Sequence, residues 1–274
     1  MRISYRFLAC LAVVVLGVLA SSLSIAGDGR TCPGNTPLPG SAITNVRFFN
    51  DCPFSALSVV NNYPASIVIN DADQGCAGFA NLHLWRFSEN DSNRAVFENC
   101  SHYKFSASLT ISGQGQGEAG LQIAPWWSEA DGRVNVRTTD GEIACFGGRL
   151  PFYNFSGPPH NLRYTKGNNI WIEMIYNPRS LSETNPAQIT YNLNYGGMAY
   201  SSGPLNFDMA NPGEDPPHGL WGALYPHYAG GHFQPFFQGR DTNLRATWTN
   251  INFEGPSATP AENTTWGRLK ALYR

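Results

Sequence analysis

Residues 105–112 read Phe-Ser-Ala-Ser-Leu-Thr-Ile-Ser, so every odd position is apolar and every even position carries a hydroxyl. Successive side chains of an extended strand point to opposite faces. This period of two therefore predicts a strand with one buried face and one solvated face. Residues 188–195 repeat the pattern, and their polar face carries Thr190, Asn192 and Asn194.

Residues 132–139 and 142–146 alternate in the same way around Asp140-Gly141. An Asp-Gly pair between two alternating segments favours a hairpin with a two-residue type I′ loop. That loop places Thr139 opposite Glu142. It also puts Arg137 on the same polar face as Glu142, where we expect a cross-strand ion pair between them.

The composition predicts a folded all-β protein. The chain has 274 residues, with 42% hydrophobic and 14% charged residues, and its 28 glycines and 19 prolines interrupt it too often for long helices. The net charge of -2 argues against an electrostatic nucleic-acid binder. Strands with one apolar face each must pair their faces, so we expect a two-sheet antiparallel jelly-roll sandwich.

Four segments are expected along the chain. Residues 1–26 combine Arg2 and Arg6 with a short apolar run and small residues, which predicts a signal peptide and a secreted or cell-surface protein without a transmembrane segment. Residues 27–76 form an arm with cysteines, prolines and a hairpin, and residues 77–255 form the sandwich. Residues 256–274 form a linker and a short helical tail. That tail either mediates cell-surface attachment or docks onto the sandwich.

Five of the six cysteines follow residue 26. No two of them are spaced as in a C-x-x-C motif, which favours disulfides over a zinc site. We expect Cys52 to pair with Cys76 or Cys100 and to fasten the hairpin of the arm to the sandwich. Cys145 lies in an apolar strand pattern and is the candidate for a free thiol.

Four segments resemble the strand succession of concanavalin A-like lectin/glucanase and laminin G-like sandwiches: 79–85, 117–123, 169–176 and 246–254. The resemblance spans residues 77–255 and lies in pattern and order. Members of this superfamily include lectins, carbohydrate-binding modules, glycoside hydrolases and polysaccharide lyases, so it implies a polysaccharide or glycan partner and leaves catalysis open.

Catalytic candidates are isolated. Glu118 and Glu173 are weak candidates for a general acid or base, and ordinary hydrogen-bonded carboxylates explain them as well. The Glu-x-Asp-x-x-Glu pattern that the resemblance implies for glucanases is absent. A second candidate group is a loop-rich, aromatic stretch between Pro216 and Gln234, which contains His218, His227 and His232. It either packs against the edge of the sandwich or forms a lyase-type or sugar-facing site.

Aromatic side chains favour glycan binding. Trp126 and Trp127 follow a proline directly after a strand, and a flat ring packs well against the apolar face of a pyranose. The alternative is that one indole fills the core and the other covers a loop. The full set of candidate ligand-binding residues is Trp126, Trp127, Gln122, Asn135, Arg137, Trp221, Tyr225 and His227. Hydroxyls and amides of the polar strand faces, such as Ser108 and Asn194, would add hydrogen bonds if those faces are concave.

No cofactor is expected beyond a possible structural calcium, for which Asp71 and Asp73 are weak candidates because their loop lacks the further acids of an EF-hand. The preferred hypothesis is a secreted, non-catalytic glycan-binding protein. The alternatives are a polysaccharide-degrading enzyme and a structural or adhesive surface protein.

Overall fold

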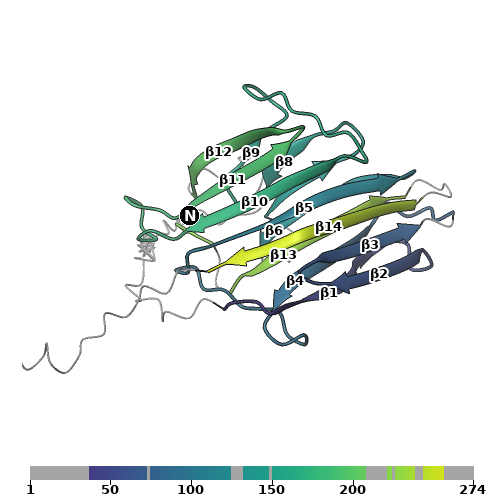
Figure 1. Ribbon diagram of the computed structural model, residues 1–274, viewed down its shortest axis with the longest axis horizontal. Coiled ribbons are helices and arrows are strands. Elements are labelled where there is room, and N and C mark those ends of the chain that lie inside the picture. Colours follow the sequence, from purple (N-terminus) through teal and green to yellow (C-terminus); the bar gives the residue numbers. More distant parts are fainter. Residues whose placement is uncertain are drawn as a thin grey trace, which may run out of the picture.

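The computed structural model describes residues 37–72, 75–124, 132–147, 150–207, 221–223, 226–237 and 243–255. These residues form two seven-stranded sheets, in which every pairing of neighbouring strands is antiparallel (Figure 1). They contain no helix, and therefore no helix that is long and apolar enough to cross a bilayer. The expected all-β, two-sheet antiparallel architecture is confirmed. The predicted signal peptide and C-terminal tail lie outside the described residues.

Each sheet combines runs of consecutive strands with strands that are far apart in the sequence. The first sheet has the spatial order β1 (Ser41–Asn50), β4 (Asn81–Ser88), β13 (Tyr228–Phe236), β6 (Gln116–Ala124), β7 (Arg133–Arg137), β8 (Ile143–Phe146) and β9 (Tyr153–Asn154). The second has the order β12 (Met198–Asn206), β11 (Gln188–Tyr195), β10 (Asn169–Asn177), β5 (Tyr103–Gly113), β14 (Asn243–Glu254), β3 (Ser66–Ala72) and β2 (Ala56–Asn62).

The core lies between the sheets and follows the predicted alternation. The odd positions of β5 from Phe105 to Ile111 are at most 1% exposed, whereas Ser108 and Thr110 face outward. The indoles of Trp85 and Trp248 meet edge to face at 6.0 Å across the two sheets. Burial of these apolar faces leaves the outer faces of both sheets for polar side chains.

Residues 41–72 belong to the sandwich, which corrects the expected boundary near residue 77. The predicted hairpin exists as β2 and β3, but β3 pairs with β14 and β1 pairs with β4. The apolar side chains Ile67 and Ile69 are fully buried in the common core. A segment rich in turn residues was mistaken for an appendage because its strand partners lie far away in the sequence.

The hairpin around Asp140 differs from the expected one. Val136 pairs with Ile143, and the Arg137 N–H donates to the Glu142 carbonyl, so the loop is longer than two residues. The Asp140 side chain accepts hydrogen bonds from Arg137 and from the Glu142 N–H, which stabilises the wider turn. The expected ion pair between Arg137 and Glu142 is confirmed at 2.7 Å.

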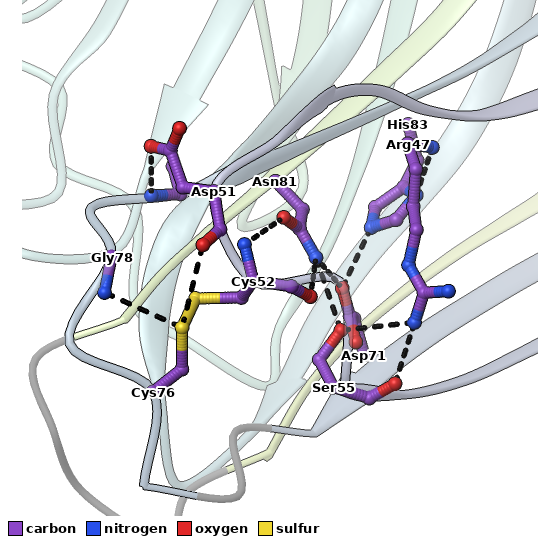
Figure 2. The surroundings of a disulfide bond; sticks show 10 residues. Arg47, Asp51, Cys52, Ser55, Asp71, Cys76, Gly78, Asn81 and His83 are labelled. Atoms are coloured by element: carbon purple, nitrogen blue, oxygen red, sulfur yellow. Dashed lines mark hydrogen bonds and ion pairs between the residues drawn. A yellow bond between two sulfur atoms is a disulfide. The ribbon is translucent and has the colours of Figure 1, made fainter.

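The Cys52–Cys76 disulfide confirms one of the two expected pairings. Figure 2 shows it beside a buried polar group, in which Asn81 binds the backbone of Cys52 through both its side-chain oxygen and nitrogen. Cys145 is a free, buried thiol as expected, and Cys100 is disulfide-bonded as well.

We expect the double variant Cys52→Ala/Cys76→Ala to lose about 3 kcal/mol of unfolding free energy, because the disulfide closes a loop with a sequence separation of 24 residues in the unfolded chain. Urea unfolding followed by tryptophan fluorescence measures the change. Cys145→Ala keeps the disulfide and is the control, with a smaller expected change. Equal stability of the double variant and the wild type would contradict the expectation.

Candidate functional site

The outer face of the first sheet gathers polar side chains from four neighbouring strands. The register of β4, β13, β6 and β7 places their outward residues in transverse rows. One row contains Arg86, Gly230, Gln122 and Arg133; the next contains Leu84, His232, Gly120 and Asn135; the third contains Gln234, Glu118 and Arg137. We call Arg86, Gln122, Arg133, His232, Asn135 and Glu118 the polar cluster.

Except for Arg133, which is half-buried, the polar cluster is buried although it lies on the outer side of its sheet. Gln122 and His232 are 0% exposed and Glu118 is 6% exposed. Polar groups this deep normally have hydrogen-bond partners, because an unpartnered one loses its hydration without compensation. Each atom of the cluster therefore needs a partner.

A chain of hydrogen bonds links Glu118, Asn135 and His232. The Asn135 Nδ2 donates to Glu118 Oε2 at 2.9 Å, and His232 Nε2 lies 2.9 Å from Asn135 Oδ1. A guanidinium nitrogen of Arg133 contacts the other oxygen of Glu118 at 3.2 Å. The carboxylate is thus held between an amide and a cation.

This chain determines which nitrogen of His232 carries the proton. A carboxylate only accepts hydrogen bonds, so Asn135 must turn its NH2 group toward Glu118 and its oxygen toward His232. His232 therefore donates from Nε2, and in the neutral ring its Nδ1 keeps a free lone pair.

Gly120 makes the bond between His232 and Asn135 possible. It lies between them on the middle strand β6, so the two side chains meet across its position. A Cβ atom there would come within 2.9 Å of His232 Cε1 and 1.8 Å of the Val134 carbonyl oxygen. Any side chain at residue 120 would displace the histidine.

Two acceptor atoms of the polar cluster have no hydrogen-bond partner within the described part of the chain. They are Gln122 Oε1 and His232 Nδ1, while the Gln122 Nε2 donates to the Gly231 carbonyl at 3.1 Å. The Arg133 Nε is a third unpartnered atom and is a donor. His232 and Gln122 are diagonal neighbours across the pairing of β13 and β6, so the two side chains occupy adjacent positions on the same face of the sheet.

Electrostatics keeps His232 neutral. Its burial, and then the positive charges of Arg133 and Arg86, hold the pKa of His232 well below its ordinary value of 6.5. The ring is therefore an acceptor at Nδ1 rather than a further cation on this face.

Arg137 lies at the exposed margin of the polar cluster and is neutralised there. It contacts Asp140 at 2.6 Å and Glu142 at 2.7 Å. The hydrogen bond from Arg137 lowers the pKa of Asp140 to about 2. Arg137 thus brings no uncompensated charge to the polar cluster.

The expected site residues separate into three groups. Glu118, Gln122, Asn135 and Arg137 lie together on the outer face of the first sheet. Glu173 lies on the outer face of the second sheet, where Asn192 donates to it at 2.8 Å, together with Ser108, Thr110, Thr190 and Asn194. The polar strand faces that were expected to add hydrogen bonds therefore lie on two different sheets of the sandwich.

The third group contains aromatic residues. Trp126, Trp127 and Tyr225 lie outside the described residues. Trp221 is half-buried, and its carbonyl accepts a hydrogen bond from the Ala187 N–H. His227 is 1% exposed and lies 2.7 Å from the Tyr103 hydroxyl, so it packs at the end of the core and does not face solvent.

Asp71, a calcium candidate, is a buried residue of β3, whereas Asp73 lies outside the described residues. Asn81 and His83 each contact Asp71 Oδ2 at 2.9 Å (Figure 2). Burial raises the pKa of Asp71, but hydrogen bonds from His83, Ser55 and Asn81 outweigh it and lower the pKa. Asp71 thus belongs to a polar group that joins strands. Within the described part of the chain, no group of three or more His, Cys, Asp or Glu residues could hold a metal ion.

The sequence reading missed Arg86, Arg133 and Gly120, and it placed His232 in a loop. The stretch from Tyr228 to Phe236 is a strand, β13, which corrects that expectation. The signal was present in Gly231-His232-Phe233-Gln234, where His232 and Gln234 alternate with a fully buried Phe233. The neighbouring glycines concealed it because glycine pairs usually mark turns.

Comparison with known proteins concerns the fold. No family model and no curated protein matches the chain. Among solved structures it is similar to a sialidase, with a TM-score of 0.43 and 13% identity over 78% of this chain and 17% of that chain. It is also similar to the PL-14 alginate lyase from Aplysia kurodai, with a TM-score of 0.41 and 9% identity over 73% of this chain and 87% of that one.

A Lotus tetragonolobus seed lectin has a TM-score of 0.40 and 9% identity over 82% of this chain and 97% of that one. These likenesses concern the fold alone. At this level of similarity, the function of the chain has to be argued from its own side chains.

We expect nitrogen NMR spectra to show His232 as the Nε2–H tautomer at pH 7, and to show that this neutral form persists as the pH falls below 6.5. A lowered pKa means that protonation needs a more acidic solution. Asn135→Ala removes the acceptor that selects the tautomer and should give a mixture. A ring that is protonated at pH 6.5, or an unchanged tautomer in Asn135→Ala, would contradict this assignment.

Proposed function

We propose that the chain binds a polysaccharide or another glycan at the polar cluster of the first sheet. The observation that supports this most directly is the pair of buried, unpartnered acceptors Gln122 Oε1 and His232 Nδ1 beside the unpartnered donor Arg133 Nε. An unsatisfied buried polar atom costs about 1–3 kcal/mol, so this arrangement favours a ligand that supplies the missing partners.

Sugar hydroxyls match these requirements. A hydroxyl group both donates and accepts, so one hydroxyl can donate to a free acceptor while it accepts from a guanidinium nitrogen. Adjacent hydroxyls of one sugar ring present several such groups at short spacing. A ligand with many hydroxyls is therefore the best chemical complement to a mixed set of amide, imidazole and guanidinium groups.

We expect a glycan to reach the polar cluster from the side of β7. Arg133 is 13% exposed in its side chain and Arg137 is 32% exposed, whereas Gln122 and His232 are 0% exposed. A glycan that enters here displaces the long side chain of Arg133 first and then reaches the free acceptors.

We also propose that the protein acts outside the cytoplasm, as a secreted or cell-surface protein. The Cys52–Cys76 disulfide supports this location, because disulfides persist mainly in oxidising compartments. The predicted signal peptide over residues 1–26 agrees with it.

Gln122→Leu should weaken glycan binding about tenfold, because it removes a hydrogen-bonding group that contacts the sugar. A glycan array identifies binders, and isothermal titration with the best one measures affinity. Asn192→Leu is the matched control, because it makes the same kind of change on the outer face of the second sheet. Unchanged affinity in Gln122→Leu with a stabilised fold would show that the free oxygen has only a structural role.

The second candidate function is polysaccharide cleavage. It is favoured by His232, whose fixed tautomer leaves the lone pair on Nδ1 without a hydrogen-bond partner. A neutral imidazole in this state can accept a proton from a bound sugar. Glu118, the earlier candidate, acts through Asn135 as a positioning residue in this scheme.

If the glycans that bind are also cleaved, activity should persist below pH 6.5, because the base His232 stays unprotonated to a lower pH than an ordinary histidine. Reducing-end and unsaturated-product assays across pH 4 to 9 measure it, and His232→Gln should abolish turnover. Binding without product from any glycan would leave the protein as a lectin-like binder. An acidic limb above pH 6.5 would exclude His232 as the base.

A further inference from the structure

A stacked pair of phenylalanines lies at one end of the face that carries the polar cluster. Phe236 ends β13 and, by the alternation of that strand, points to the same side as His232 and Gln234. Phe79 packs parallel to it, with ring centroids 5.4 Å apart and planes inclined by 24°. The two rings come from segments that the isolated pairing of Ala80 with Phe236 brings together.

Phe79 remains largely exposed to solvent although its ring stacks on Phe236. Its side chain is 65% exposed even though it stacks on a neighbour. Exposed aromatic rings that are fixed in place commonly contact ligands, because a flat apolar face loses little conformational entropy when it is covered. Half-buried Gln234 lies in the next row of the same sheet face and offers an amide beside the rings.

The backbone around Phe79 is held firmly. The Ala80 N–H donates to Asp51 Oδ2 at 3.2 Å, and the Asp51 N–H donates to the Ala80 carbonyl at 3.3 Å. A Cβ on Gly78 would lie 2.6 Å from the Asp51 carbonyl oxygen, so the two segments are in tight contact. The Cys52–Cys76 disulfide ties the same two segments together (Figure 2).

The spacing of the rings from the polar cluster selects a chain-like ligand. Phe236 follows His232 by four residues on one strand, which corresponds to about 13 Å at the usual rise per residue. A single sugar does not span that distance, whereas an oligosaccharide lying along β13 does.

We propose that Phe79 and Phe236 form an aromatic subsite for a second pyranose ring of the same glycan chain. The inference rests on the proposed function, because it extends the contact from the polar cluster to the end of the face. Sugar hydroxyls at one end meet the free acceptors. The apolar face of a ring farther along the chain covers Phe79.

The disulfide has a functional consequence in this scheme. It stabilises the position of Phe79 by fixing residues 76–80 against Asp51 and Cys52. Loss of the disulfide should therefore weaken the contact of the distant sugar without altering the hydrogen bonds at Gln122 and His232.

The test compares hexasaccharides with disaccharides of two series, cello-oligosaccharides and oligomannuronates, by titration calorimetry on the full chain. In the series that binds, Phe79→Ala should weaken hexasaccharide binding about tenfold and leave disaccharide binding unchanged. Phe79→Tyr keeps a stacking ring and should retain affinity. Phe54→Ala is the matched control, because Phe54 is 88% exposed in the neighbouring turn and should not affect either ligand.

The outcomes separate this inference from the proposed function. If Gln122→Leu weakens both ligands but Phe79→Ala weakens neither, the aromatic subsite is wrong and the polar cluster still binds glycan. Equal losses in Phe79→Ala and Phe54→Ala would indicate a general effect on the fold and would also overturn the subsite. If no member of either series binds to the wild type, both the aromatic subsite and glycan binding at the polar cluster are overturned.

Discussion

The indole of Trp248 links the two sheets at Gly120, and the polar cluster depends on this glycine. Its N–H donates across the core to the Gly120 carbonyl at 3.2 Å. On the opposite side of β6, the missing side chain of Gly120 lets His232 reach Asn135. Since successive residues of a strand face opposite ways, packing on the core side fixes which residues reach the outer side. A one-residue slip of β6 would bury Glu118 and Gln122 in the core.

Local alternation was enough to predict which side chains share a face within one strand. Ser108 and Thr110 on β5, and Asn135 and Arg137 on β7, lie as expected from their period of two. The alternation also predicted the two-sheet sandwich, because every such strand needs a partner for its apolar face. These features depend only on neighbours in the sequence, which is why the sequence alone reveals them.

The grouping of the site could not be predicted in the same way. Arg86, Gln122 and His232 come together because β13 inserts between β4 and β6, and β13 follows β6 by more than a hundred residues. No local pattern specifies such a pairing. For the same reason the sequence did not reveal that the polar faces of β5 and β7 belong to different sheets, or that residues 41–72 are part of the sandwich.

The polar faces of the two sheets differ in whether their polar groups have hydrogen-bond partners, and this difference decides which face is the better candidate for a ligand. On the second sheet, Glu173 has Asn192 as a partner, and the surrounding hydroxyls are accessible to water, which satisfies them at little cost. On the first sheet, Gln122 and His232 are fully buried and still keep free acceptors. Water-exposed polar groups need no further explanation, whereas buried unpartnered ones persist only if another role compensates for their cost. The first sheet is therefore where a ligand gains most from binding, because it supplies hydrogen bonds that the protein itself leaves unmade.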